Sequence, residues 1–129
     1  MKKKVLSDDY TKIAALCDDR NIEVHAQYGK HFKVRIPTYG RDLAYNALNC
    51  DLFAVGSTNE IYRLNLFEGK FLKSFETSAN SINSIAVNDP MEIMGIAGEK
   101  GIVELWDLKA KNKIIGLPIL ENSLYKNYE

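Results

Sequence analysis

Three ten-residue segments of this chain of 129 residues share the same pattern of turn residues followed by strand residues. The copies begin at residues 17, 56 and 98, so they are 39 and 42 residues apart, and they align without gaps. A period close to roughly 40–45 residues is typical of a unit of four β-strands that stacks on similar neighbours. The repeat therefore favours a chain of stacked sheets.

Each copy lies in the same sequence surroundings. A short apolar run precedes it, as expected for a strand that is buried on both faces. These runs occupy residues 13–16, 52–55 and 93–96. The copy opens with a turn rich in Asp, Asn, Gly and Ser, which favour tight turns, and continues as a strand. A second turn then leads to a further strand. These further strands are predicted at 31–37, 70–76 and 113–117.

These features predict an all-β fold: a partial WD-type β-propeller of about three four-stranded antiparallel blades. The predicted blades span about residues 5–38, 39–78 and 79–120, and residues 121–129 form a C-terminal tail. Opening strands are expected at 41–47 and 81–87, whereas the first blade is expected to be incomplete because it lacks this strand.

Three blades are too few to close into a propeller ring, because known rings contain roughly four to eight blades. Two apolar blade faces would remain exposed, and such faces promote association. We therefore expect the chain to be an excerpt, a truncated gene model or one piece of a larger assembly whose remaining blades are missing from it. A small β-sandwich built from the same strands is the alternative fold.

The third repeat also predicts which side chains face the core. In the alternating strand Val103-Glu104-Leu105-Trp106, we expect Leu105 to point inward and Glu104 to point toward solvent. On this interpretation Leu105→Asp unfolds or aggregates the chain, whereas Glu104→Lys is tolerated. Trp106 is expected to be a core residue between blades.

Charge and cysteine content exclude several classes of protein. The 17 basic and 17 acidic side chains cancel, so attraction to nucleic acid must come from a local patch. Cys17 and Cys50 are too few for a disulfide-rich secreted scaffold, which favours a reducing compartment. The apolar stretch 114–120 is too short to span a bilayer and contains a proline, so no membrane contact is expected.

The residue types that carry catalysis or bind metal are not arranged in any motif. His25, His31 and the two cysteines lack the close paired spacing of a zinc site and form no thiol-activating pattern. Phosphate-binding glycine loops are also absent from the sequence. The pairs Asp8-Asp9 and Asp18-Asp19 are interpreted as turn residues. We expect no enzyme activity, no metal, no cofactor and no small-molecule substrate.

Residues 24–41 form a segment with no acidic side chain, in which basic and aromatic residues alternate. Such a segment suits RNA or an acidic protein segment, through phosphate pairing and base stacking. The candidate contact residues are Lys30, Lys33, Arg35, Tyr39 and Arg41. Two structural alternatives remain open. Lys33 and Arg35 could be the solvated face of an alternating strand, and Arg41 with Asp42 could join neighbouring strands.

Two motifs are more specific than the repeat. One is Ile36-Pro37-x-x-Gly40-Arg41-Asp42, and the other is Ile61-Tyr62-Arg63-Leu64-Asn65-Leu66 followed by Gly69. Together with the Trp106-Asp107 pair, they give a chain that closely resembles the N-terminal propeller of the nucleolar protein 10 family over residues 5 to 107. Further segments that carry the resemblance are 7–12, 19–23 and 49–52.

The resemblance implies a nucleolar WD-repeat scaffold of the small-subunit processome, acting in maturation of the small ribosomal subunit RNA. The implied location is the nucleus and nucleolus, and the implied partners are pre-ribosomal proteins and pre-rRNA. Family members have a full propeller and a charged C-terminal region, and this sequence departs from that pattern because it contains neither the later blades nor that region. A generic WD-repeat peptide-binding module of cytoplasmic signalling or ubiquitin-ligase complexes is the alternative function.

Overall fold

The computed structural model describes residues 2–5, 12–26 and 29–118. Within these ranges the chain forms twelve β-strands and one short 3-10 turn. The elements are β1 (Lys2–Val5), β2 (Ile13–Leu16), β3 (Asn21–Ala26), β4 (Gly29–Arg35), β5 (Gly40–Asn46), β6 (Asp51–Gly56), β7 (Glu60–Asn65), β8 (Lys70–Glu76), β9 (Ile82–Asn88), β10 (Ile93–Gly98), η1 (Glu99–Gly101), β11 (Ile102–Asp107) and β12 (Asn112–Pro118).

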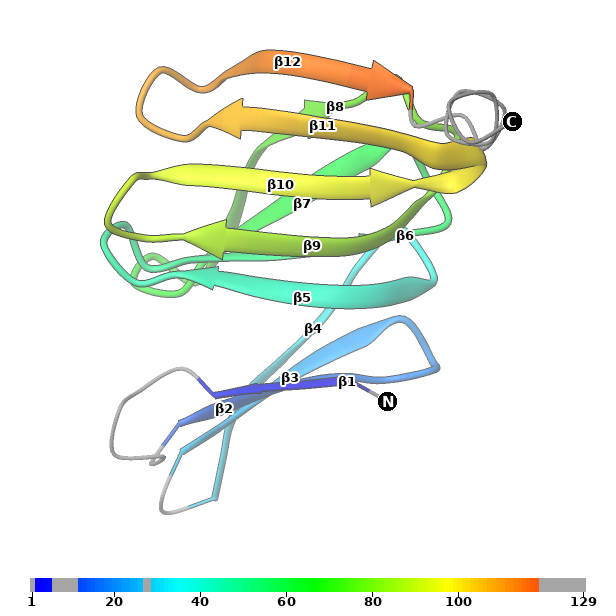
Figure 1. Ribbon diagram of the computed structural model, residues 1–129. Helices are drawn as coiled ribbons and strands as arrows, with labels where there is room; N and C mark the ends of the chain where they lie inside the picture. The colour runs from blue at the N-terminus through cyan, green and yellow to red at the C-terminus, as the bar shows by residue number, and fades with distance from the viewer. Residues whose placement is uncertain (1, 6–11, 27–28, 119–129) are drawn as a thin grey trace.

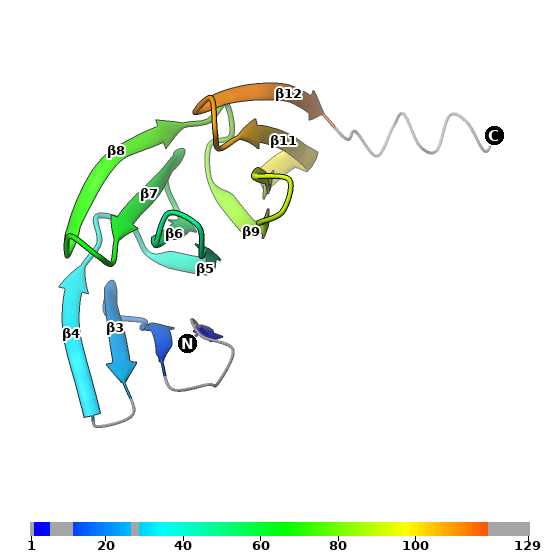
Figure 2. The same ribbon diagram turned by 90° about the vertical axis from the view of Figure 1, so that its left-hand side faces the viewer.

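The strands form three four-stranded sheets, each antiparallel and each made of four consecutive strands. The sheets follow one another as a fan of blades, with β4, β8 and β12 along the outer arc (Figure 2). The strands β5 and β9 lie on the inner side of the fan, next to each other (Figure 1). The predicted fold class, all-β with three propeller blades, is therefore confirmed.

The first blade differs from the prediction in one respect. The sequence pattern indicated an incomplete blade, but β1 pairs with β2, with Lys2 opposite Leu16 and Val5 opposite Ile13. This first strand could not be recognised in advance because Lys2–Val5 shows no alternation of apolar and polar residues. Its pairing rests on backbone hydrogen bonds along the edge of β2, which do not depend on side-chain pattern.

The core consists of two layers of apolar side chains, one between each pair of neighbouring blades. The layer between the first and second blades contains Ala14, Leu16, Ile22, Val24, Ile36, Leu43, Leu52, Ala54, Tyr62 and Leu64. The layer between the second and third blades contains Ala44, Phe53, Val55, Ile61, Phe75, Ala79, Ile82, Ile85, Met94, Ile96, Trp106 and Leu108. The central strand β6 is buried along its whole length because it contributes to both layers.

Close packing explains two glycines that lie opposite each other in the pairing of β5 with β6. A Cβ atom at Gly40 would overlap the side chain of Leu16 in the first blade. A Cβ atom at Gly56 would overlap the carbonyl oxygen of Tyr39. Both positions therefore favour a residue without a side chain, and Gly40 lets β5 pack closely on Leu16 of the first blade.

Trp106 lies between the second and third blades, as predicted. It is 7% exposed, and its ring stacks on Phe75 with the centroids 5.1 Å apart. The orientation predicted for its neighbours was wrong, because Glu104 is fully buried and Leu105 is 39% exposed. Since alternate residues of a strand share a face, Glu104 and Trp106 both point toward the second blade.

Glu104 can be buried because its carboxylate has partners. Oε2 accepts hydrogen bonds from the backbone N–H of Ser78 (2.9 Å) and from the Ser78 hydroxyl, and Oε1 accepts one from Trp106 Nε1 (3.0 Å). The ammonium of Lys113 lies 3.9 Å from Oε2. Ser78 belongs to the segment that connects β8 to β9, so Glu104 ties this connection to the third blade.

Candidate interaction surface

The outer strand of the first blade, β4, carries three of the five predicted contact residues. Lys33 and Arg35 are both exposed, and they lie on the face opposite to Val34, which packs against the core layer. Lys33 lies opposite Glu23 on β3, and Lys30 lies opposite His25. The side chain of Lys30 lies outside the described part of the chain.

Tyr39 and Arg35 come together with a basic residue that the sequence analysis missed. The Cζ atom of Arg20 lies 5.1 Å from the centroid of the Tyr39 ring, a cation–π distance. Arg20 and Arg35 also line the same shallow cavity of about 290 Å³, together with Ile36 and Pro37. The Tyr39 side chain is 63% exposed, so an aromatic ring and two guanidinium groups are available at one end of the first blade.

Arg20 is positioned by the β2–β3 turn. Its carbonyl oxygen accepts a hydrogen bond from the backbone N–H of Ile36 (2.8 Å), which brings the turn against the connection between β4 and β5. Arg20 was not among the predicted contact residues because it lies outside the acid-free segment and directly follows Asp18-Asp19. The predicted antiparallel pairing of the strands around it was a usable signal, because that pairing places residue 20 beside residue 36.

Arg41 is not part of this group. Its Nη1 donates hydrogen bonds to Asn83 Oδ1 (2.9 Å), Ser81 Oγ (3.1 Å) and Glu99 Oε1 (3.3 Å) of the third blade. A hydrogen bond from Ser81 and then the nearby Arg41 guanidinium lower the pKa of the Glu99 carboxyl below its ordinary value. Arg41 therefore joins the second blade to the third, and these contacts favour the structural alternative for this residue.

Asp42 also joins neighbouring strands, as in the structural alternative given above. Its Oδ2 accepts a hydrogen bond from the backbone N–H of Ile85 on β9 (3.0 Å), and its Oδ1 accepts one from the N–H of Leu43 (2.9 Å). Arg41 and Asp42 thus reach the third blade from adjacent positions of β5. In the Gly-Arg-Asp sequence, Gly40 packs closely on the Leu16 side chain of the first blade, and Arg41 and Asp42 connect to the third blade.

Acidic groups accompany the basic ones on the first blade. Glu23 Oε1 lies 3.2 Å from His25 Nε2, and Asp19 is exposed in the same turn as Arg20. A hydrogen bond from the Asn21 side chain is the main cause that lowers the pKa of Asp19. The surface is therefore mixed in charge, and its basic part is concentrated at Lys33, Arg35 and Arg20.

The thiol of Cys17 lies near this surface without the properties of a nucleophile. Burial and then the neighbouring Glu23 carboxylate raise its pKa, and a protonated thiol is unreactive. Among residues 12–26 and 29–118, the structure contains no group of three or more side chains that could hold a metal ion. In the same described ranges, no helix has the length and apolar character needed to cross a membrane. Asp8 and Asp9, assigned to a turn by the sequence analysis, lie outside the described residues.

Comparison with protein families gives one match over almost the whole chain. The family described as "Nucleolar protein 10-like, N-terminal domain" matches residues 1–127. This match agrees with the resemblance that the Gly40-Arg41-Asp42 and Ile61-Tyr62-Arg63 motifs carry.

Curated proteins with similar sequences agree with this family match. Nucleolar protein 10 of Xenopus tropicalis is 41% identical over 114 residues, which cover 88% of this chain and 17% of that protein. Nucleolar protein 10 of Homo sapiens is 40% identical over 126 residues, covering 98% of this chain and 18% of that protein. Ribosome biogenesis protein ENP2 of Saccharomyces cerevisiae is 39% identical over 120 residues, covering 93% and 17%. The chain thus spans less than a fifth of the length of these relatives.

Solved structures with the same fold are more distant in sequence. The structure of U3-55K superposes with a TM-score of 0.80 and 12% identity, covering 89% of this chain and 38% of that chain. The crystal structure of RRP9 WD40 repeats superposes with a TM-score of 0.79 and 13% identity, covering 89% and 37%. Similarity of this kind establishes the fold, which is that of part of a WD-type propeller.

Proposed function

The chain belongs to the nucleolar protein 10-like family, and from this premise we propose that it is a non-enzymatic binding module of a ribosome-biogenesis factor. The process is assembly of the small ribosomal subunit and maturation of its RNA. The partners are pre-ribosomal proteins and pre-rRNA, and the location is the nucleolus, in keeping with the name of the relatives. The mechanism is passive, because rigid blades present contacts and no side chain makes or breaks bonds.

One observation supports RNA as a partner more than any other: Arg20, Arg35 and the exposed Tyr39 ring converge at one end of the first blade. Guanidinium groups pair with phosphate in a two-pronged geometry, and an aromatic ring offers a stacking platform to an unpaired base. Lys33 extends the basic surface along β4, on the same face as Arg35.

Charge reversal tests this proposal. The double variant Lys33→Glu/Arg35→Glu should weaken binding of a small-subunit precursor RNA transcript. It should also reduce the slope of log affinity against log salt by about 1.4, because about 0.7 counterions are released per phosphate contact with single-stranded RNA. Filter binding at a series of salt concentrations measures both quantities. Unchanged affinity and slope would contradict RNA contact at this surface.

A matched control is available on the second blade. Lys70→Glu/Lys73→Glu makes the same change of charge on exposed residues of β8, the corresponding outer strand. We expect this variant to bind RNA nearly as the unmodified chain does. An equal loss in both double variants would mean that net charge alone governs the affinity and that the first blade has no special role.

Capture from cell extract tests the wider assignment. The tagged chain should recover small-subunit precursor RNA together with processome proteins. Recovery of chaperones alone would contradict the proposal. Recovery of cytoplasmic signalling or ubiquitin-ligase components would instead favour the alternative of a generic peptide-binding module.

A further inference from the structure

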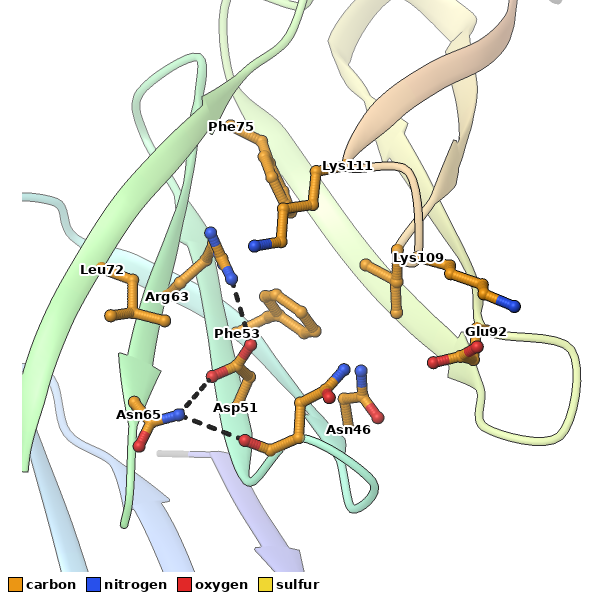
Figure 3. A pocket seen from close by; sticks show the side chains of 12 residues that line it. Asn46, Asp51, Phe53, Arg63, Asn65, Leu72, Phe75, Glu92, Lys109 and Lys111 are labelled. Carbon is orange, nitrogen blue, oxygen red and sulfur yellow. Dashed lines mark hydrogen bonds and ion pairs between the residues drawn. The ribbon is translucent and has the colours of Figure 1, made fainter. Parts of the chain in front are cut away.

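A cavity of about 340 Å³ opens between the second and third blades (Figure 3). Its lining comes from β5 to β8 and from the two turns β9–β10 and β11–β12. This volume lies at the small end of the range of roughly 300–1,000 Å³ that is usual for ligand sites. The cavity contains none of the candidate contact residues discussed above.

The floor of the cavity is a buried ion pair with fixed geometry. Arg63 Nη2 lies 3.2 Å from Asp51 Oδ2, and the two side chains are 9% and 5% exposed. Asn65 Nδ2 donates to Asp51 Oδ1 (2.9 Å), as Figure 3 shows, and Arg63 Nη1 donates to the carbonyl of Lys73 (3.2 Å). The guanidinium also lies over the Phe75 ring, 4.7 Å from its centroid. These contacts hold the floor in place without an external ligand.

Two polar groups at the cavity are buried without any partner among the described residues. Asn46 is 1% exposed, yet neither its Nδ2 nor its Oδ1 has a hydrogen-bond partner there, and the same holds for Arg63 Nε. Buried polar atoms are normally hydrogen-bonded because leaving them unpaired is costly. A donor and an acceptor on one amide are complementary to a second amide, such as a peptide group.

The ionisable lining favours an anion. Arg63, Lys109 and Lys111 face two carboxylates, Asp51 and Glu92, and Asp51 is already paired with Arg63. In Figure 3 the ammonium group of Lys111 is directed toward Arg63. Two cations that line one cavity attract a carboxylate that can reach both of them.

Exposed apolar side chains lie at the same end of the blades as the cavity. Leu48, Phe67 and Met91 are 65%, 88% and 65% exposed, and they occupy the turns β5–β6, β7–β8 and β9–β10. Backbone hydrogen bonds join these turns in pairs, from Leu66 N–H to the Cys50 carbonyl (2.8 Å) and from Leu108 N–H to the Glu92 carbonyl (2.9 Å). Leu48 and Met91 share their turns with the cavity residues Asn49 and Glu92, and apolar groups beside a polar pocket are typical of a protein-binding site.

Peptide is favoured over RNA as the occupant. The two aromatic rings that line the cavity, Phe53 and Phe75, are only 1% and 8% exposed, so they offer no face on which a base could stack. Leu48 and Met91 have no ring, and the exposed ring of Phe67 does not line the cavity. The site is also separate from the proposed RNA surface, because β5 begins beside Tyr39 and ends at Asn46, at the opposite end of the blade.

We propose that this cavity binds an extended segment of a partner protein in which an acidic side chain is flanked by apolar residues. The carboxylate lies between Lys111 and Arg63, a peptide group of the segment pairs with the Asn46 amide, and the apolar neighbours cover Leu48, Phe67 and Met91. The proposal does not depend on RNA binding at the first blade.

An NMR titration of the isotope-labelled chain tests this proposal. The probe is the capped pentapeptide acetyl-Ala-Leu-Glu-Leu-Ala-amide, compared with peptides that carry Gln or Lys in place of Glu. We expect the backbone amide signals of the cavity residues to shift, and the Glu peptide to bind about tenfold more tightly than the Lys peptide, since charge-assisted hydrogen bonds are the strong ones. Equal affinity for all three peptides, or shifts confined to other residues, would overturn the proposal.

Two variants separate binding from folding. Asn46→Ala removes an amide that has no partner in the described structure, so the urea midpoint should not fall while peptide affinity falls about tenfold. Lys111→Ala should weaken the Glu peptide by a similar factor. Lys100→Ala should not, because Lys100 is an exposed lysine with a similar positive φ that lies outside the cavity. A large loss of stability in Asn46→Ala would mean that the amide serves the fold, which contradicts the proposal. Displacement of the peptide by an RNA oligonucleotide in the unmodified chain, but not in Asn46→Ala, would make RNA the occupant instead.

Discussion

Replacement of Glu104 tests the orientation of β11. In Glu104→Ala, the indole N–H of Trp106 and the backbone N–H of Ser78 lose their acceptor. The indole N–H is a buried donor, and leaving it unpaired costs about 1–3 kcal/mol, whereas Ser78 is exposed and its N–H can bond to water instead. We therefore expect a loss of about 2 kcal/mol in the free energy of unfolding. Lys113 adds little to this loss because it is 42% exposed and can turn to water.

Replacement of the next residue is the matched comparison. Leu105 is 39% exposed on the face of the third blade that points away from the second. Leu105→Ala therefore opens no enclosed cavity, and only the transfer of part of one side chain is lost, about 1 kcal/mol. The ordering of the two losses follows directly from which of the two side chains points toward the second blade.

Urea unfolding followed by tryptophan fluorescence measures both variants. With a slope of about 2 kcal/mol per molar urea, the midpoint should fall by about 1 M for Glu104→Ala and by about 0.5 M for Leu105→Ala. The charged variants should give the same order more strongly, with Glu104→Lys unfolding the chain and Leu105→Asp tolerated. A larger loss at Leu105 than at Glu104 would refute this account and restore the orientation that the sequence pattern indicates.

Two further predictions follow from the contacts between and within the blades. Arg41→Ala should lower stability by about 1 kcal/mol through its hydrogen bonds to Ser81 and Asn83, while leaving RNA affinity unchanged. A loss of RNA affinity at full stability would show that Arg41 is a contact residue after all. Burial, followed by a hydrogen bond with Cys50, raises the pKa of Tyr45 to about 12 from its ordinary 10.0. Between these two values the unfolded chain loses a proton that the folded chain keeps, so stability should fall as pH rises from 10 to 12. Urea midpoints across this range should fall less steeply in Tyr45→Phe, and an identical slope would contradict the assignment.

The strands could be predicted from sequence because their signals are local. The apolar runs at 13–16, 52–55 and 93–96 lie within β2, β6 and β10, and β8 occupies residues 70–76 as predicted. Each signal depends on residues within one strand and its turns, and the threefold repeat reinforces it. The opening strand β1 had no such signal, which is why it was missed.

The candidate surface could be predicted only in part. Lys33, Arg35 and Tyr39 are exposed as a contact role requires. The involvement of Arg20 and the attachment of Arg41 to the third blade depend on pairings between residues far apart in sequence. Composition and spacing carry no information about which long side chain will find a partner 40 or more positions away, as Arg41 does with Ser81 and Asn83.

The sequence by itself determined the blade as the repeating unit, the positions of most strands and the family to which the chain is similar. The tertiary structure alone decided which face of a strand is buried. Alternation distinguishes the two faces of β11 but does not say which one meets the neighbouring blade. Without partners, the Glu104 carboxylate would be expected on the solvent-exposed face of the strand. Here the donors of Ser78 and Trp106 compensate for its desolvation. The Ser78 donor lies 26 positions away in sequence and reaches Glu104 only in the folded chain.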